Sequence, residues 1–150
     1  MSSNTTKYHL LLCMSFAVLS AGVSLATSAA ALPAADLSGQ WVGASLLDGQ
    51  RETVKTVLDL NTAGDSTLRV ESRMTCTLNG GNVASLDGSD AAAWTLSFKS
   101  AHGGEACERM AQGKIVLRAG DKPRTLDFDL VYPGRDGASN HRHGLLSHYP

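Results

Sequence analysis

CTLNGGNVASLDGSDAAAWTLSFKSAHGGEAC, the segment from Cys76 to Cys107, decides the fold of this chain. It holds the two cysteines that remain once an N-terminal leader is set aside. An even pair of cysteines in an exported chain usually forms a disulfide. A redox or metal-binding pair would typically show a C-x-x-C spacing, which is missing here. We therefore predict a Cys76–Cys107 disulfide that closes a long loop in a small β domain.

Between the cysteines, Ala91 to Lys99 predicts a strand with one apolar face. Large apolar residues recur at every second position, which is the period of a half-buried strand. The residues on that face are Ala92, Trp94, Leu96 and Phe98. The same alternation recurs from Thr125 to Val131, where the inward residues are Leu126, Phe128 and Leu130. Both stretches predict strands that pack on a common core.

The N-terminus predicts a secretory signal peptide. Lys7 stands before an apolar run from Leu10 to about Ala26, and small residues follow the run. A charged start, an apolar middle and a small-residue cleavage site are typical of such a leader. The run is also short for a bilayer span of about 20 residues, so we favour removal over a retained anchor. We place cleavage after Ala31, which removes residues 1–31.

Residues 32–150, about 119 in number, are then enough for a single domain with one core. We expect this domain to be secreted or periplasmic, with no membrane span after processing. The whole chain has 13 basic and 14 acidic residues, and only Lys7 is lost with the leader, which leaves 12 against 14. No basic block is present, so we expect no nucleic-acid partner.

The rest of the chain reads as short strands separated by turns. Candidate strands cover 36–47, 53–60, 66–73, 83–86, 113–118 and 141–149, in addition to the two above. Cys76 and Leu78 continue the third strand until Asn79-Gly80-Gly81-Asn82 breaks it. We predict an all-β fold, an antiparallel up-and-down barrel of about eight strands. A β-sandwich is the alternative, although no tyrosine stands two residues before Cys107 as in immunoglobulin domains.

Several motifs resemble those of known barrels. Gly39-Gln40-Trp41 resembles the G-x-W signature of lipocalins and related calycin barrels. Trp94-Thr95-Leu96-Ser97-Phe98-Lys99 resembles the W-T-V-x-W-K strand of avidin-type barrels. A wider pattern, spanning nearly the whole mature region, is similar to that of small exported bacterial proteins. It consists of Gly39-Gln40-Trp41-Val42-Gly43, Cys76, Gly104-Glu105-Ala106-Cys107 and Gly144-Leu145-Leu146.

These resemblances imply a calycin-like barrel of eight strands, with Trp41 packed across one closed end. They do not carry over biotin binding, because avidin-type sites use several tryptophans and the chain has 2.

Two groups of residues are candidates for binding. Trp41, Trp94 and Phe98 would contact a ligand held inside an open barrel. The second group lies on a predicted long loop from Gly134 to His143 and consists of Arg135, His141, Arg142 and His143. Binding residues often lie on loops held by a rigid scaffold, and arginine is a frequent anchor in a partner's cleft.

The residues suited to chemistry form weaker patterns. His141 and His143 would project from one face of a strand and could chelate a metal, but His148 has the opposite parity and no third ligand is evident. Asp127 and Asp129 share a face without a flanking sugar cleft. Ser139, His141 and Asp136 are triad residue types without a nucleophile elbow. We therefore predict no catalytic residue, no metal and no cofactor.

Three functions follow from these patterns. The leading hypothesis is an exported, non-enzymatic binding module that engages an unidentified protein partner or envelope component through its loops. The alternative is a small-molecule carrier that binds its ligand in the barrel. The weakest is a metal-dependent hydrolase that uses His141 and His143.

Overall fold

The structure is a computed structural model that describes residues 37–86 and 93–150. The predicted signal peptide, 1–31, lies outside the described residues, as do the turn at 87–90 and the first two residues of the strand predicted from Ala91. Within the described part of the chain, no helix is long and apolar enough to cross a membrane.

Strands make up most of the described chain. They are β1 (Gly39–Leu47), β2 (Thr53–Leu60), β3 (Ser66–Glu71), β4 (Thr75–Ser85), β5 (Ala93–Ser97), β6 (Ser100–His102), β7 (Lys114–Ala119), β8 (Thr125–Pro133) and β9 (Ser139–Tyr149). One helix, α1 (Glu105–Ala111), stands between β6 and β7.

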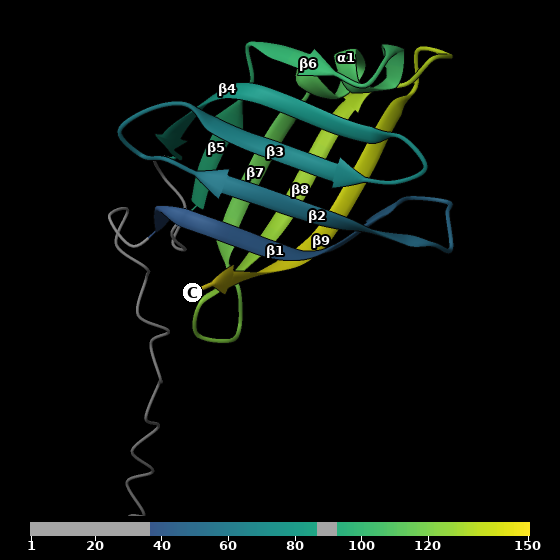
Figure 1. Cartoon of the computed structure of the whole chain (residues 1–150). Coiled ribbons are helices and arrows are strands. Elements are labelled where there is room, and N and C mark those ends of the chain that lie inside the picture. The colour runs from purple at the N-terminus through teal and green to yellow at the C-terminus, as the bar shows by residue number, and fades with distance from the viewer. Residues whose placement is uncertain (1–36, 87–92) are drawn as a thin grey trace, which may run out of the picture.

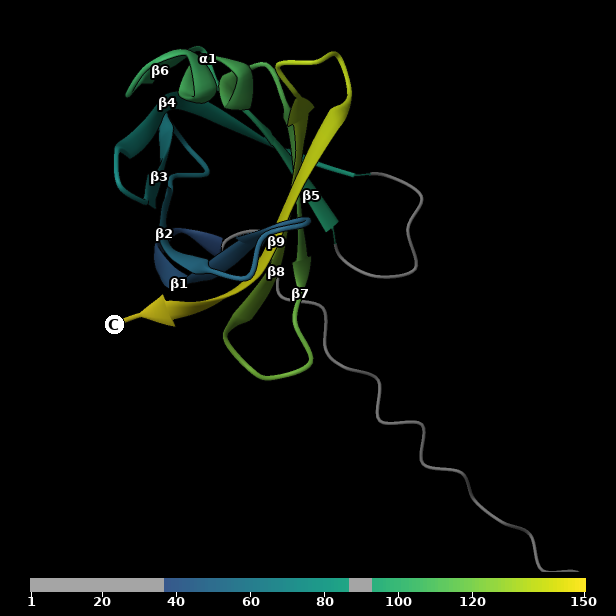
Figure 2. The same ribbon diagram turned by 90° about the vertical axis from the view of Figure 1, so that its right-hand side faces the viewer.

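Eight of these strands form a closed antiparallel barrel. The hydrogen-bonded order is β3-β2-β1-β9-β8-β7-β5-β4, and pairing of β3 with β4 closes the ring. Short β6 pairs with β4 outside this ring. In Figure 1, β1 to β4 cross in front of β5, β7, β8 and β9, and Figure 2 shows these two groups as opposite walls. The predicted all-β, up-and-down barrel is confirmed. The alternative, a β-sandwich, is wrong because the strands close into one ring.

The core fills the inside of the barrel. Period-2 alternation turns every second side chain inward, and the inward residues of all eight strands join one buried cluster. The largest of its fully buried members are Trp41, Phe128, Leu37, Leu58, Leu68, Leu78, Leu96, Ile115, Leu117, Leu126, Leu130 and Leu146. The indole Nε1 of Trp41 donates a hydrogen bond to the carbonyl oxygen of Leu37, 2.8 Å away.

Helix α1 corrects the sequence prediction of an all-β chain, in which no helix was expected near Cys107. Seven residues are too few for apolar periodicity to be recognised, but one local contact and one tertiary contact stabilise the helix. Glu105 and Arg109 form an i,i+4 ion pair, and Cys107 and Met110 are buried on the inner side. Figures 1 and 2 show α1 at the top of the barrel, where it contacts β4 and β8.

The predicted partnership of Cys76 and Cys107 is confirmed as a disulfide-distance pair, with 5.5 Å between the Cα atoms. Cys76 lies on β4 and Cys107 on α1, so the pair joins the helix to the barrel wall. The linkage keeps α1 against the end of the barrel that it covers.

The predicted break at Asn79 to Asn82 is wrong, because β4 continues through it. Gly80 has a φ of 73°, a conformation that glycine adopts without steric cost, so the strand bends there instead of ending. A Cβ on Gly81 would lie 2.8 Å from the ring of Phe98. On one side β4 pairs with β3 from Thr75 to Gly81; on the other side it pairs with β6 before the bend and with β5 after it.

Candidate functional site

The loop predicted from Gly134 to His143 is shorter than expected. Strand β8 continues to Pro133 and β9 begins at Ser139, so only residues 134–138 form the turn. Cross-strand pairs such as Tyr132 with Asn140 and Val131 with His141 extend the ladder almost to the tip. Arg135 lies exposed on the turn, whereas His141, Arg142 and His143 belong to β9.

The candidates on β9 divide between two faces because successive strand residues point to opposite sides. Arg142 is 5% exposed and lies inside the barrel, whereas His141 and His143 lie on its outer face. The predicted group of loop residues therefore does not form one surface.

The aromatic candidates belong to the core. Trp41 is 1% exposed and Trp94 is 4% exposed, and both are members of the buried cluster. Phe98 is half-buried and packs against the same cluster. These three side chains are therefore part of the packing inside or against the core of the barrel.

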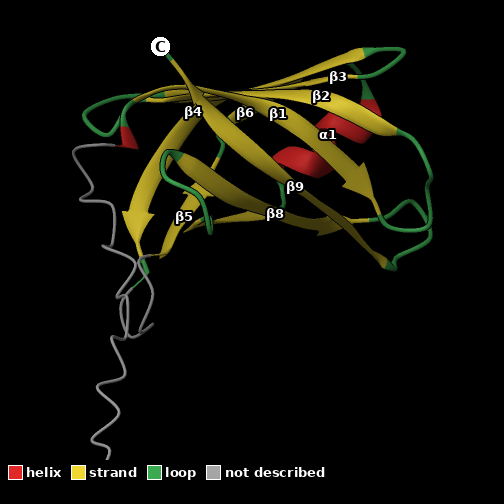
Figure 3. Ribbon diagram, turned by 90° about the horizontal axis from the view of Figure 1, so that it is seen from below, coloured by secondary structure: helices red, strands yellow, loops and turns green. Residues whose placement is uncertain are grey.

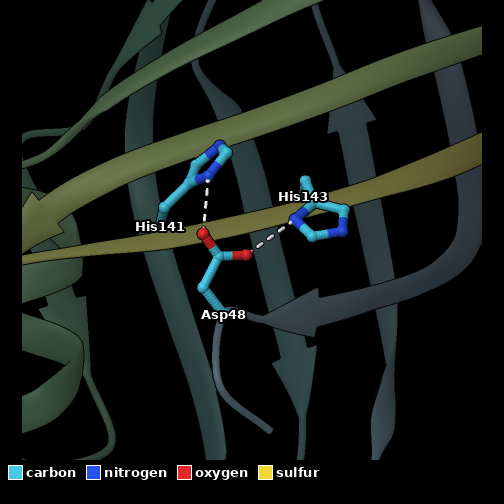
Figure 4. Close-up of side chains that lie close together, drawn as sticks. All are labelled: Asp48, His141 and His143. Carbon is cyan, nitrogen blue, oxygen red and sulfur yellow. Dashed lines mark hydrogen bonds and ion pairs between the residues drawn. The ribbon is translucent and has the colours of Figure 1, made fainter. Parts of the chain in front are cut away.

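On the outer face, His141 and His143 meet Asp48, which directly follows β1 (Figure 4). His141 Nδ1 lies 3.1 Å from Oδ2 of Asp48, and His143 Nδ1 lies 3.2 Å from Oδ1. The amide nitrogen of Asp48 also donates to the carbonyl oxygen of His141, 2.9 Å away. One carboxylate thus lies between two imidazoles, with its backbone tied to the strand that carries both of them.

A second carboxylate, that of Asp129, contacts the other ring nitrogen of His141. Its Nε2 lies 3.0 Å from Oδ1 of Asp129 on β8, and Nη1 of Arg118 on β7 donates to Oδ2 of Asp129 over 2.7 Å. The hydrogen bond to Asp129 raises the pKa of His141 above its ordinary value of 6.5, and Asp48 adds to this effect while desolvation opposes it. Both ring nitrogens of His141 face carboxylate oxygens, an arrangement that favours the imidazolium form.

These residues are part of a larger surface, which we call the β8–β9 patch. It consists of outward residues that pair across the ladder: Val131 with His141, Asp129 with His143, and Asp127 with Leu145. Val131 and Leu145 are each 45% exposed and flank the ionisable centre. An open groove of about 490 Å³ runs over the patch beside Arg118. Figure 3 shows β9, which carries the histidines, between β1 and β8.

His148 does not join the other two histidines, as its parity predicts. Its ring lies edge-on to Trp41 with 5.0 Å between centroids, and its Nδ1 lies 2.6 Å from Nη2 of Arg124. The triad types do not assemble either. Asp136 accepts a hydrogen bond from the amide of Ala138, and His141 bonds Asp48 and Asp129.

Arg142 is the second unusual feature. Its Nη1 donates to Oγ of Ser45 over 3.1 Å, and Ser45 in turn shares a hydrogen bond with Thr56. Its Nε is buried and has no hydrogen-bond partner within residues 37–86 and 93–150. Burying a charge without a counter-charge is costly, so this guanidinium needs an explanation.

Asp48 was not predicted as a site residue, since it directly follows the strand predicted over 36–47 and carries no motif of its own. The signal that could have found it is closure of the barrel. In an up-and-down barrel the first and last strands pair antiparallel, so the end of the first strand lies beside the start of the last. Here Leu47 pairs with Arg142, which places Asp48 next to His141.

Comparison of the chain with protein-family models, with curated proteins and with solved structures gave no match. The barrel is compatible with a non-enzymatic protein, and the fold alone does not imply an activity. A function must therefore be argued from the sites themselves.

Proposed function

We propose that the protein is an exported, non-enzymatic binding module that engages a protein or another envelope component through the β8–β9 patch. The observation that supports this proposal is the position of the site. Exposed apolar side chains and ionisable groups gather on the outer face, whereas the inward apolar residues form one packed cluster.

The composition of the patch suits a protein partner. Interfaces commonly combine exposed apolar contacts with charged groups that set orientation. Val131 and Leu145 supply exposed apolar contacts, and the groove that Leu145 lines also carries Asp129 and the two histidines. Arg135 on the neighbouring turn is exposed and can add an electrostatic contact.

Two features of the sequence support export to the periplasm or the cell exterior. The first is the leader-like segment at residues 1–31. The second is the Cys76–Cys107 pair, since structural disulfides persist in oxidising compartments.

The test is native mass spectrometry of cross-linked protein from the extracytoplasmic fraction of its own host. The Leu145→Asp variant should lose the partner complex, because a charge replaces an exposed apolar contact. The matched control is Met74→Asp, which alters an exposed apolar residue in the β3–β4 turn, away from the patch. A complex that survives Leu145→Asp, or one lost equally in Met74→Asp, would contradict the proposal.

A small-molecule carrier is the second candidate, and one observation favours it. The Arg142 guanidinium is buried, and its Nε has no hydrogen-bond partner within residues 37–86 and 93–150. A carboxylate or another small anion bound beside it would neutralise this charge. In the same native mass spectra, a small bound anion that is lost in Arg142→Met would support the carrier over the binding module.

A further inference from the structure

We propose that Asp48, His141 and His143 bind one divalent transition-metal ion of the zinc class on the outer face of the barrel. This inference goes beyond the proposed function, since the ion would bind whether or not the patch engages a partner. It also departs from the expectation drawn from the sequence, which found two histidines but no third ligand.

The donor set and its spacing fit such an ion. The three donor atoms lie within 4.8 Å of one another. Zinc bonds of about 2.0–2.1 Å place neighbouring tetrahedral ligands about 3.3–3.4 Å apart. Each imidazole Nδ1 lies near a different oxygen of Asp48, 3.1 Å away for His141 and 3.2 Å away for His143, so the carboxylate stands within ligand spacing of both rings. Small rotations of the two imidazoles, whose ring centroids are 5.5 Å apart, would direct both Nδ1 atoms to one point.

The backbone holds the three ligands in place. His141 and His143 share a face through the period of β9, which is paired on both sides, with β1 and with β8. Asp48 is fixed by its amide hydrogen bond to His141 at the start of the β1–β2 turn. Ligands on paired strands and a tight turn need little reordering before an ion binds.

The partners behind the ligands also match a metal site. Histidine ligands commonly donate their other ring N–H to a carboxylate, which fixes the tautomer and orients the ring. Asp129 is placed to accept from Nε2 of His141, and Arg118 holds Asp129 in position. A cation beside Asp48 would displace the Nδ1 proton of His141 and bind the lone pair that this frees, while the Nε2 proton stays directed to Asp129.

The ligand types select the class of ion. Two imidazole nitrogens and one carboxylate suit Zn²⁺, Co²⁺, Ni²⁺ or Cu²⁺, whereas Ca²⁺ and Mg²⁺ prefer oxygen donors. Three protein ligands leave at least one coordination position open. Because the histidines border the open groove of the β8–β9 patch, water or a donor from a partner could occupy that position.

The experiment is a titration of the untagged protein, since a polyhistidine tag would bind the same ions. After treatment with chelator, Co²⁺ is added and its visible absorption is recorded, and Zn²⁺ binding is measured by calorimetry. The wild type should take up about one ion per chain with the absorption of a low-coordinate Co²⁺ site. Zn²⁺ should also raise its Tm, because an ion that binds the folded state stabilises it.

The variants locate the site. His143→Ala and Asp48→Asn should lose the Co²⁺ absorption and the Zn²⁺-induced rise in Tm. His102→Ala, which removes an exposed histidine on β6, is the matched control and should bind like the wild type. Asp129→Asn should weaken binding roughly 10- to 100-fold while keeping one ion per chain.

Circular dichroism of the metal-free variants establishes that each is folded before titration. Absence of saturable binding by the wild type would overturn the proposal. So would undiminished binding by folded His143→Ala and Asp48→Asn, or loss of binding in His102→Ala. Metal binding and partner capture are separate readouts, so failure of one does not decide the other.

Discussion

Asp129 and His141 are bonded diagonally across the β8–β9 ladder, with 3.0 Å between Oδ1 and Nε2, although the backbone partner of Asp129 is His143. The diagonal contact leaves Nδ1 of His141 facing Asp48. Asp129 is therefore a positioning residue for His141, and its removal should change the chemistry of the ring before it changes the fold.

The pKa of His141 in the metal-free protein should lie above its ordinary 6.5, and Asp129→Asn should lower it. The groups around the ring are Asp129, Asp48, Arg118 and His143. Because the pKa of His141 is raised in the folded state, the protonated imidazole stabilises the fold. This stabilisation is fully present below pH 6.5 and is lost as the pH rises through the folded-state pKa. Imidazole NMR titration of both proteins measures the shift.

Stability follows from the same titration. In chelator-treated samples, the free energy of unfolding of Asp129→Asn should fall below that of the wild type by a larger amount at pH 5.5 than at pH 8. A deficit that does not vary with pH, together with an unchanged His141 pKa, would contradict the role given to Asp129.

The Cys76–Cys107 pair should carry a large share of the domain's stability. The two residues are 31 apart in sequence, and closing a loop of that length is worth about 3–4 kcal/mol in the chain-entropy account. Cys76→Ser should therefore lower Tm by roughly 10 °C or more under oxidising conditions. In reductant the wild type should melt close to the variant. Equal melting of wild type and variant without reductant, or two titratable thiols in the native protein, would oppose this expectation.

Much of the barrel was predictable because each strand carries its own signal. Trp94 and Leu96, like Phe128 and Leu130, alternate with polar residues, so the inward face could be read from either stretch alone. Turn residues such as Asp48-Gly49 then separated most of the strands. The prediction that Cys76 and Leu78 continue the third strand is wrong, because the chain turns at 72–74 and both residues lie on antiparallel β4. Helix α1 was missed because it depends on tertiary packing of Cys107 and Met110 more than on a local pattern. The glycines of β4 were misread because a bend and a break have the same local signal.

The site was only half predictable. The spacing of His141 and His143 gave their common face, but Asp48 lies 93 residues from His141 in the sequence. Only pairing of the first strand with the last brings them together. Arg142 was grouped with its neighbours because the predicted loop extended to His143. The same alternation that places His141 and His143 on one face of β9 (Ser139–Tyr149) sends Arg142, which lies between them, to the other face.

Trp41 should be more important for stability than for ligand binding. Its buried indole contacts Leu37 by a hydrogen bond and His148 by its ring edge. Trp41→Ala should cost about 3–5 kcal/mol of unfolding free energy through the cavity that it leaves. Trp41→Phe keeps an aromatic ring but leaves the Leu37 carbonyl without its donor, which should cost about 1–3 kcal/mol.

Urea denaturation followed by far-UV circular dichroism measures both changes without relying on tryptophan fluorescence. Leu145→Ala, at an exposed position, is the control and should change the free energy by less than about 0.5 kcal/mol. Equal stability of wild type and Trp41→Ala would mean that the indole is not part of the packed core.

Arg142 should add little to stability, or even reduce it, although it is buried. Its guanidinium has lost its water, forms no ion pair within residues 37–86 and 93–150, and donates to Ser45. Replacing buried charged groups by apolar residues of similar volume is often neutral or stabilising. Arg142→Met should therefore leave the unfolding free energy unchanged or raise it by about 1–3 kcal/mol in urea denaturation.

Arg135→Met makes the same chemical change on the exposed β8–β9 turn and should have an effect within about 0.5 kcal/mol. A loss of more than about 1 kcal/mol in Arg142→Met would mean that the hydrogen bonds of the guanidinium outweigh its desolvation. A gain in stability would instead mean that Arg142 is retained at a cost to folding. That result would favour a role in binding an anion at this end of the barrel over a role in the packed core.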